Sequence, residues 1–373
     1  MNRRRFISQS GASAAAAVAA LTAGELAHST QPVSAQAQGQ KRALMKAGAT
    51  VRCTDEELKS VARYGITQIV SPPPIADAGR LYANVDELKG MHDIADRNGA
   101  TVYLLTPPNL ASSHIDRERN PGIMLGKSPE RDREIEAVQT MIKNCAAAGI
   151  PAIKYNLSIL GVLRTGTIPG RGDSTYTSFK LADAKPNPPL TRAGVVTKDM
   201  HWERITYFLD HVIPVANEYK VRMALHPNDS MTPPEGYQGV HAVLDTVEGL
   251  KKFVSIQESP YHGLNFCQGT ISEMLQNPGQ EIFDVIRYFG TRKKIFNVHF
   301  RNIIGNRQEF AEVAPDAGVV NMAKAMLTYK EVGYDGVLHP DHVVRAPSDP
   351  GGDQYTAFVY GYLRALIQMA DIV

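Results

Sequence analysis

Beyond about residue 40, short apolar runs rich in β-branched residues alternate with longer segments whose apolar residues recur at helical spacing. Glycine, proline and asparagine fall between these runs, as expected of turns. The short runs predict eight strands, near 43–51, 66–71, 101–106, 151–156, 221–227, 262–268, 295–301 and 334–340. The longer segments predict eight helices, near 54–63, 85–98, 130–148, 199–219, 243–257, 279–289, 320–331 and 354–371.

Eight strand–helix pairs favour one α/β architecture, a single-domain (β/α)8 TIM barrel over residues 41–373, which exceeds the roughly 250 residues that this fold needs. The alternative, a doubly wound open sheet, predicts a G-x-G-x-x-G turn after the first strand, and the sequence has none. Local signals agree with the predicted helices: Thr54 before three acidic residues is typical of a helix start, and Gly149 of a helix end.

Two connections are longer than ordinary loops, 107–129 after the third strand and 157–198 after the fourth. Long structureless connections in a compact domain are usually lids or binding loops. Because both follow strands, we expect both on the C-terminal face of the barrel, where barrel enzymes hold their active sites.

The first 37 residues predict a signal peptide rather than a part of the fold. The pair Arg3–Arg4, the apolar Phe6–Ile7 and the Ala-rich stretch 11–21 resemble a twin-arginine export signal. Small residues allow cleavage after Ala35 or Ala37. The apolar stretch is too short to span a membrane, so we expect a periplasmic or exported protein with no membrane insertion after processing.

Composition argues against nucleic-acid binding and against a disulfide-stabilised fold. Lys and Arg number 40 against 38 Asp and Glu, and the net charge of +2 gives no field for binding nucleic acid. Three cysteines are too few for a disulfide framework.

Four metal-competent side chains stand at the ends of the last four predicted strands: His226, Cys267, His299 and Asp341. The carboxyl ends of parallel barrel strands converge at one mouth, so these four groups are predicted to surround one point. Two imidazoles, a thiolate and a carboxylate suit a divalent first-row metal ion. A lone His or Cys would more often be structural, but the coincidence on four consecutive strands favours a metal site.

Further polar residues follow the same strand ends. Arg301 is a candidate clamp for a substrate carboxylate, because its planar fork matches that group, and Asn302 lies beside it. His342 and Tyr355 are candidate proton carriers. Asn302 and Arg345, the latter in the last predicted loop, are further candidate substrate-binding residues.

The chain resembles the mannonate dehydratases of the xylose-isomerase-like barrels, as a divergent exported member. The resemblance is densest in segments 207–216, 223–227, 266–267, 298–302 and 340–342, and extends upstream through 148–156 to Arg164. It implies one divalent ion, Mn²⁺ first and Fe²⁺, Co²⁺ or Zn²⁺ as alternatives, held by the four ligands above. It also implies catalysis by His342 and Tyr355, in either acid–base assignment, and substrate binding by Arg301, Asn156 and Arg164.

The family reaction removes water from a sugar acid such as D-mannonate and leaves a 2-keto-3-deoxy acid. The same barrel supports a second hypothesis, a metal-dependent sugar isomerase or epimerase. A third is an exported carbohydrate-binding protein without catalysis. The mass of the product separates the first two, because only a dehydratase releases water. Homo-oligomerisation is implied by the resemblance alone.

Overall fold

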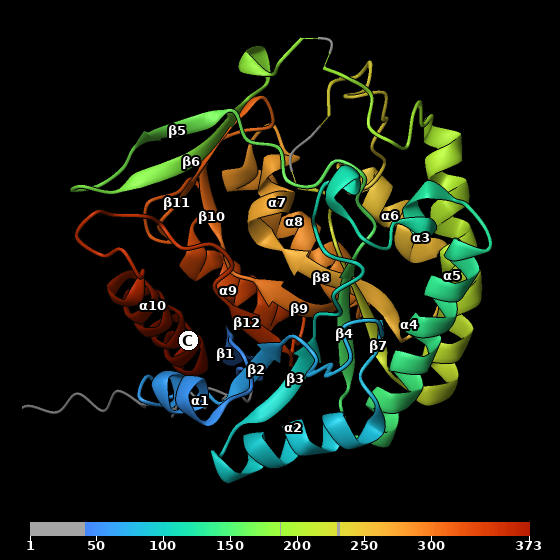
Figure 1. Cartoon of the computed structure of the whole chain (residues 1–373). Helices are drawn as coiled ribbons and strands as arrows, with labels where there is room; N and C mark the ends of the chain where they lie inside the picture. The colour runs from blue at the N-terminus through green and yellow to red at the C-terminus, as the bar shows by residue number, and fades with distance from the viewer. Residues whose placement is uncertain (1–41, 187, 230–231) are drawn as a thin grey trace, which may run out of the picture. The chain divides into compact units, whose positions relative to one another are not determined.

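A computed structural model describes residues 42–373 except 187 and 230–231; the predicted signal peptide lies outside the described residues. Eight parallel strands close into a barrel in the order β1-β12-β9-β8-β7-β4-β3-β2 (Figure 1). The strands are β1 Lys46–Thr50, β2 Gln68–Ser71, β3 Thr101–Leu105, β4 Ala152–Asn156, β7 Arg222–His226, β8 His262–Cys267, β9 Ile295–His299 and β12 Val337–His339. The predicted TIM barrel is confirmed.

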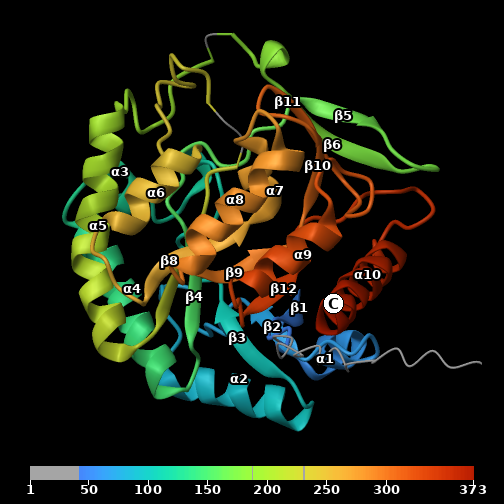
Figure 2. The same ribbon diagram turned by 180° about the vertical axis from the view of Figure 1, so that it is seen from behind.

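Helices surround this barrel on the outside (Figures 1 and 2). The eight that follow the barrel strands are α1 Asp55–Ala62, α2 Val85–Arg97, α4 Glu130–Ala147, α5 Lys198–Tyr219, α6 Val247–Ser255, α8 Pro278–Thr291, α9 Met322–Glu331 and α10 Asp353–Ile372. The Thr54 side chain accepts a hydrogen bond from the Glu57 amide and caps α1, and Gly149 has a positive φ just beyond α4, as predicted. Tyr64, just after α1, packs against Tyr360 of α10 with ring centroids 5.8 Å apart, so the last helix lies beside the first.

A second sheet, antiparallel and ordered β10-β11-β6-β5, lies over the C-terminal ends of the barrel strands (Figure 1). Its strands are β5 Gly166–Pro169, β6 Thr175–Lys180, β10 Asn302–Gly305 and β11 Glu309–Val313. The expectation that 157–198 is structureless is therefore wrong, although its place on the C-terminal face is confirmed. The four strands escape sequence analysis because each is short, and because the pairing of β6 with β11 that joins the two hairpins into one sheet comes from a distant loop.

Two short α-helices also lie outside the predicted elements: α3 Gly122–Leu125, in the long connection after β3, and α7 Gln268–Glu273, directly after β8. The chain also forms 3-10 turns at Ile115–Arg117 and Leu181–Asp183. Within the described part of the chain, no helix has the length and apolarity to cross a membrane.

The interior of the barrel is layered from apolar to polar. The lowest layer is apolar and consists of Val70, Leu104, Ala152, Ala224 and Phe296. Above it the Asn297 amide contacts Asn265 and His339, and His339 contacts Thr50. The uppermost layer holds the predicted metal ligands. Each strand thus exposes increasingly polar side chains toward its carboxyl end, and the barrel has a rigid floor beneath a polar mouth.

We predict that Gly48→Ala destabilises the barrel by about 1–3 kcal/mol. An added Cβ would collide with Val337 of β12 and lie 2.9 Å from the carbonyl oxygen of Gln68 on β2, where β1 closes the barrel. The control is Gly90→Ala within α2, where a Cβ meets no atom within 4 Å. The control should gain about 0.5–1 kcal/mol from helix propensity. Urea denaturation followed by circular dichroism measures both changes; equal midpoints for the two variants would contradict this account.

Candidate metal and active site

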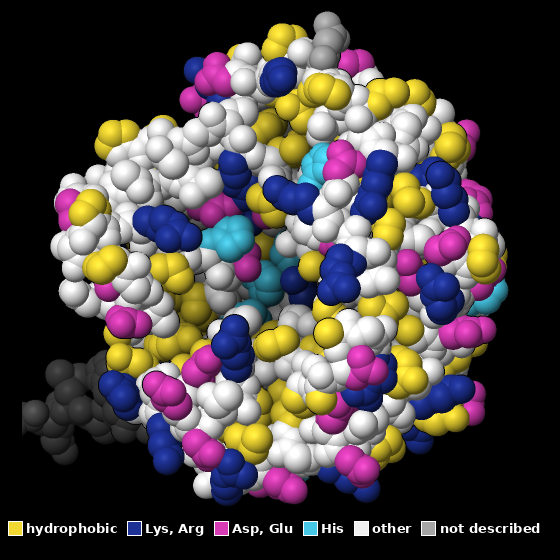
Figure 3. Space-filling view, in the orientation of Figure 1, with side chains coloured by type: hydrophobic (Ala, Val, Ile, Leu, Met, Phe, Trp, Pro, Cys, Tyr) yellow, Lys and Arg dark blue, Asp and Glu magenta, His cyan; other side chains and the backbone are white. Residues whose placement is uncertain are grey.

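The four predicted ligands converge at the mouth of the barrel. His226, Cys267 and His299 are the last residues of β7, β8 and β9, and Asp341 lies two residues beyond β12. Each offers one ligand atom, and these atoms all lie within 4.8 Å of one another. Figure 3 shows histidine and acidic side chains in a hollow on this face, with Lys and Arg side chains around it. The barrel topology therefore assembles one compact donor set from four separate strands.

Both histidines of this set are neutral near pH 7, and the neutral imidazole is the form that binds metals. Burial lowers the pKa of His226 to about 4, and burial holds the pKa of His299 well below its usual value. Nδ1 of His226 lies 2.7 Å from the carbonyl oxygen of Pro227 and donates to it, which leaves Nε2 as an acceptor. Nδ1 of His299 is buried without a hydrogen bond, although Asp341 Oδ1 lies 3.2 Å away. A nitrogen in that position fits a cation between the side chains.

The other two ligands complete a borderline-soft set. Burial opposes the charge of Asp341, but His299 and His342 outweigh it and hold the pKa of Asp341 well below its usual range. Burial raises the pKa of the Cys267 thiol to about 12, while the Arg301 guanidinium opposes that rise. Because metal binding displaces the thiol proton, and Thr270 donates through its amide and hydroxyl to the sulfur, the site fits a divalent ion.

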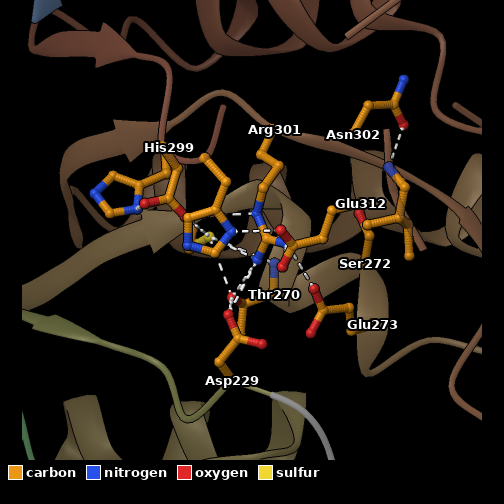
Figure 4. Close-up of polar contacts among 12 residues, drawn as sticks. Asp229, Thr270, Ser272, Glu273, His299, Arg301, Asn302 and Glu312 are labelled. Atoms are coloured by element: carbon orange, nitrogen blue, oxygen red, sulfur yellow. Dashed lines mark hydrogen bonds and ion pairs between the residues drawn. The ribbon is translucent and has the colours of Figure 1, made fainter. Parts of the chain in front are cut away.

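A buried cluster of charges lies directly beside the ligands (Figure 4). Its acidic members, here called the carboxylate trio, are Asp229 after β7, Glu273 on α7 and Glu312 on β11. Arg301 donates to Glu273 and Glu312 at 2.8 Å each, and to Asp229 at 3.2 Å. Arg164 pairs with Asp229 at 2.8 Å and with Glu312. Burial raises the pKa of Glu273 to about 8, so near neutral pH two guanidinium groups face two ionised carboxylates, Asp229 and Glu312. The trio therefore forms an ion-pair network rather than a second metal site.

Arg301, which the sequence predicts to bind a substrate carboxylate, donates its hydrogen bonds to this network instead. Arg301 is only 5% exposed, and Nη2 also donates to the Thr270 hydroxyl at 2.9 Å. Its remaining nitrogen, Nε, lies 3.5 Å from Asp341 Oδ2. Every edge of the guanidinium therefore faces a protein group, and no pair of N–H groups is left for a substrate carboxylate. Arg164 is held in the same network. Arg301 lines the same cleft as His342 and Tyr355, with its N–H groups engaged by protein partners.

The two predicted proton carriers line one cleft beside the ligands. Nδ1 of His342 donates to Glu312 Oε2 at 2.6 Å, which orients the ring. Burial opposes the charged form of His342, but Asp341 and Glu312 outweigh it and raise its pKa. Burial raises the pKa of Tyr355 well above its usual value, so its phenol stays protonated at neutral pH. Desolvation of the phenolate is the main cause, and the nearby acidic groups act in the same direction.

Two predicted substrate-binding residues do not join this site through their side chains. The buried Asn302 amide donates to the carbonyls of Pro315 and Val320 and accepts from two backbone amides, so its hydrogen-bonding capacity is used. Figure 4 shows it pointing away from Arg301. Arg345 is exposed, and its backbone carbonyl bonds to the Thr175 amide.

Asn156 does lie at the site. It pairs in register with His226 across β4 and β7, is 2% exposed, and its side-chain oxygen is buried without a hydrogen-bond partner among the described residues. An amide oxygen that is buried and unbonded beside a metal ligand fits contact with a bound molecule.

Sequence reasoning missed the carboxylate trio and Lys154, which β4 places inside the barrel. The short run 309–313 has three apolar residues among its five and could have placed Glu312 on a strand. Nothing in the sequence pairs Glu312 with Arg301, however, because that ion pair depends on the β10–β11 hairpin. Glu273 lies on a helix too short to produce a periodic pattern.

Comparison with known proteins gives one consistent family. Residues 190–371 match the family model of D-mannonate dehydratase (UxuA). The mannonate dehydratase of Shouchella clausii is 30% identical over 292 residues, which cover 69% of this chain and 76% of that protein. The enzyme of the same name from Streptococcus pneumoniae is 28% identical over 347 residues, covering 84% and 87% respectively.

A solved structure supports the same fold. The crystal structure of mannonate dehydratase from Streptococcus suis serotype 2 superposes with a TM-score of 0.73 at 24% identity and covers 87% of this chain and 95% of that one. The match in sequence to the Shouchella protein extends over most of both chains. This chain belongs to the mannonate dehydratase family.

Proposed function

We propose that this protein is a metal-assisted dehydratase of sugar acids, with D-mannonate as substrate, 2-keto-3-deoxygluconate as product and Mn²⁺ as the metal. The observation that carries the proposal is the convergence of His226, Cys267, His299 and Asp341 at one barrel mouth in a chain of this family. Mannonate dehydratases are metal-dependent, and these four residues would hold the ion. Fe²⁺, Co²⁺ and Zn²⁺ suit the same donors.

The reaction removes a proton from the carbon beside the carboxylate and a hydroxyl from the next carbon. When bound, a divalent ion supplies electrostatic stabilisation of the negative charge that develops on the substrate. Tyr355 holds a proton on its phenol and acts as the donor to the leaving hydroxyl. His342, oriented by Glu312, takes the proton from carbon. The buried network around Arg301 excludes water from one side of the site.

The N-terminal segment supports export as a further part of the proposal. The Arg3–Arg4 pair and the weakly apolar stretch after it fit a twin-arginine signal, which would place the enzyme in the periplasm or outside the cell. Homo-oligomerisation is proposed from family membership alone.

The first prediction concerns metal binding. Cys267→Ser should lower the affinity for Mn²⁺ at least tenfold, on the order of the loss that changes at metal sites cause, because a hydroxyl ligates far more weakly than a thiolate. Equilibrium dialysis followed by elemental analysis measures the bound ion. The control is Cys53→Ser, a half-buried cysteine whose thiol donates to the Met91 carbonyl, a bond that serine can keep. Equal affinities in the two variants would remove Cys267 from the ligand set.

The second prediction concerns the reaction itself. Manganese-loaded protein incubated with D-mannonate should release an acid that is lighter by one water, detected by mass spectrometry. An isomer of unchanged mass would instead support the metal-dependent isomerase or epimerase. Turnover of neither kind across a panel of aldonic acids would exclude both enzymes and favour an exported binding protein.

The third prediction concerns proton donation. Tyr355→Phe should lower kcat for D-mannonate by about 10²- to 10⁴-fold, the usual loss for a general acid, while Mn²⁺ content stays unchanged. Tyr362→Phe, on the same helix α10, is the matched control and should keep wild-type kcat. If Tyr355→Phe turns over at the wild-type rate, the proton comes from another group.

A further inference from the structure

Lys154 lies on the face of β4 that points into the barrel. Ala152, two residues earlier, belongs to the apolar layer of the interior, and side chains two apart on a strand share a face. In register, Lys154 pairs with Ala224 and Asn156 pairs with His226. The backbone of Lys154 therefore lies one step below the ligand layer, and its four-carbon side chain extends from there within the mouth of the barrel.

The charges that act on Lys154 agree with the placement that the β4–β7 register gives it. Burial lowers the pKa of Lys154, and the charges of Asp341 and Cys267 oppose that shift. Burial is the main cause of the low pKa of His226, and the charge of Lys154 lowers that pKa further. The lysine is thus within electrostatic reach of three of the four ligands, at the inner end of the site.

Within residues 42–373, apart from 187 and 230–231, no side chain forms an ion pair or hydrogen bond with Lys154. The side chain of Lys154 is half-buried, and an ammonium that is partly withdrawn from water without a protein partner is stabilised by pairing with an anionic ligand. The nearby Asn156 oxygen is also buried and unbonded. The inner end of the site therefore presents one cation and one amide oxygen, both from β4, that have no partner among the residues that the structure describes.

The competing cations are occupied. Arg301 and Arg164 are neutralised by the carboxylate trio. An anionic substrate entering this acidic site needs a positive group besides the metal, and Lys154 is a cation that the ion-pair network of the described residues leaves available.

We propose that Lys154 is a substrate-binding residue whose ammonium pairs with the carboxylate of the sugar acid, while Asn156 contacts an adjacent hydroxyl. This inference rests on the proposed function, because it takes the ligand to be an aldonic acid. On this proposal, Lys154 inside the barrel selects the sugar acid over the corresponding polyol, and no arginine is needed to bind the carboxylate.

The test compares D-mannonate with D-mannitol, which has the same carbon chain without the carboxylate. Isothermal titration of the manganese-loaded full chain, in a Tyr355→Phe background to prevent turnover, gives the preference for the acid. Lys154→Met should reduce that preference about 10- to 100-fold, as expected for loss of a hydrogen bond between charged groups. Lys154→Arg should retain part of it. Lys89→Met, on the exposed surface of α2, is the control and should change nothing.

Three results would overturn the assignment: a full preference in Lys154→Met, no preference in the parent protein, or a loss confined to metal content and melting temperature. The last would mean that the lysine only balances the charge of the ligand set, and Lys154→Gln should then show the same loss. Failure of the proposed function has a different signature, since protein with intact Tyr355 would then bind D-mannonate without releasing the dehydrated acid.

Discussion

The burial of the Arg301 guanidinium is the constraint on which the arrangement of the active site depends. A cation that is 5% exposed must be matched by polar partners, and the chain provides them from three separate elements: Asp229 after β7, Glu273 on α7 and Glu312 on β11. Burial raises the pKa of Glu273 to about 8, so Asp229 and Glu312 carry the balancing negative charges near neutral pH. Removing either of them would leave charge uncompensated in a desolvated environment, where breaking a buried pair costs about 3–5 kcal/mol. The network therefore holds the antiparallel sheet against the barrel mouth.

The same ion pairs also influence the proposed catalytic and metal-binding residues. Glu312 bonds simultaneously to Arg301 and to Nδ1 of His342, so the ring orientation of a proposed catalytic histidine depends on a strand that folds back from the loop after β9. Arg301 also contacts Cys267 at 3.6 Å and thereby favours the thiolate that a metal needs. The charge state of Cys267 and the orientation of His342 thus depend on the same ion-pair network, although these residues come from different strands.

The layered barrel interior explains why the metal ligands and Lys154 can coexist. An apolar layer lies beneath the site, the amide layer of Asn265 and Asn297 carries no charge, and the metal ligands and the ion-pair network lie at the mouth. In such an environment an ammonium on β4 acts strongly on the neighbouring imidazoles, and it would act equally strongly on a bound carboxylate. The long loops after β3 and β4 then cover only one side of a site whose binding groups are fixed by rigid strands.

The sequence by itself determined the eight strand–helix pairs, because hydrophobic periodicity and caps such as Thr54 act within a few residues. It also determined that His226, Cys267, His299 and Asp341 lie together, since strand ends in a closed parallel barrel must converge. Only the tertiary structure decided that Arg301 is buried among three carboxylates, that the Asn302 amide is consumed by backbone groups, and that Lys154 faces the interior unpaired by any described residue. Those outcomes depend on which distant loops meet at the barrel mouth, and ion pairing over such separations leaves no periodic trace along the chain.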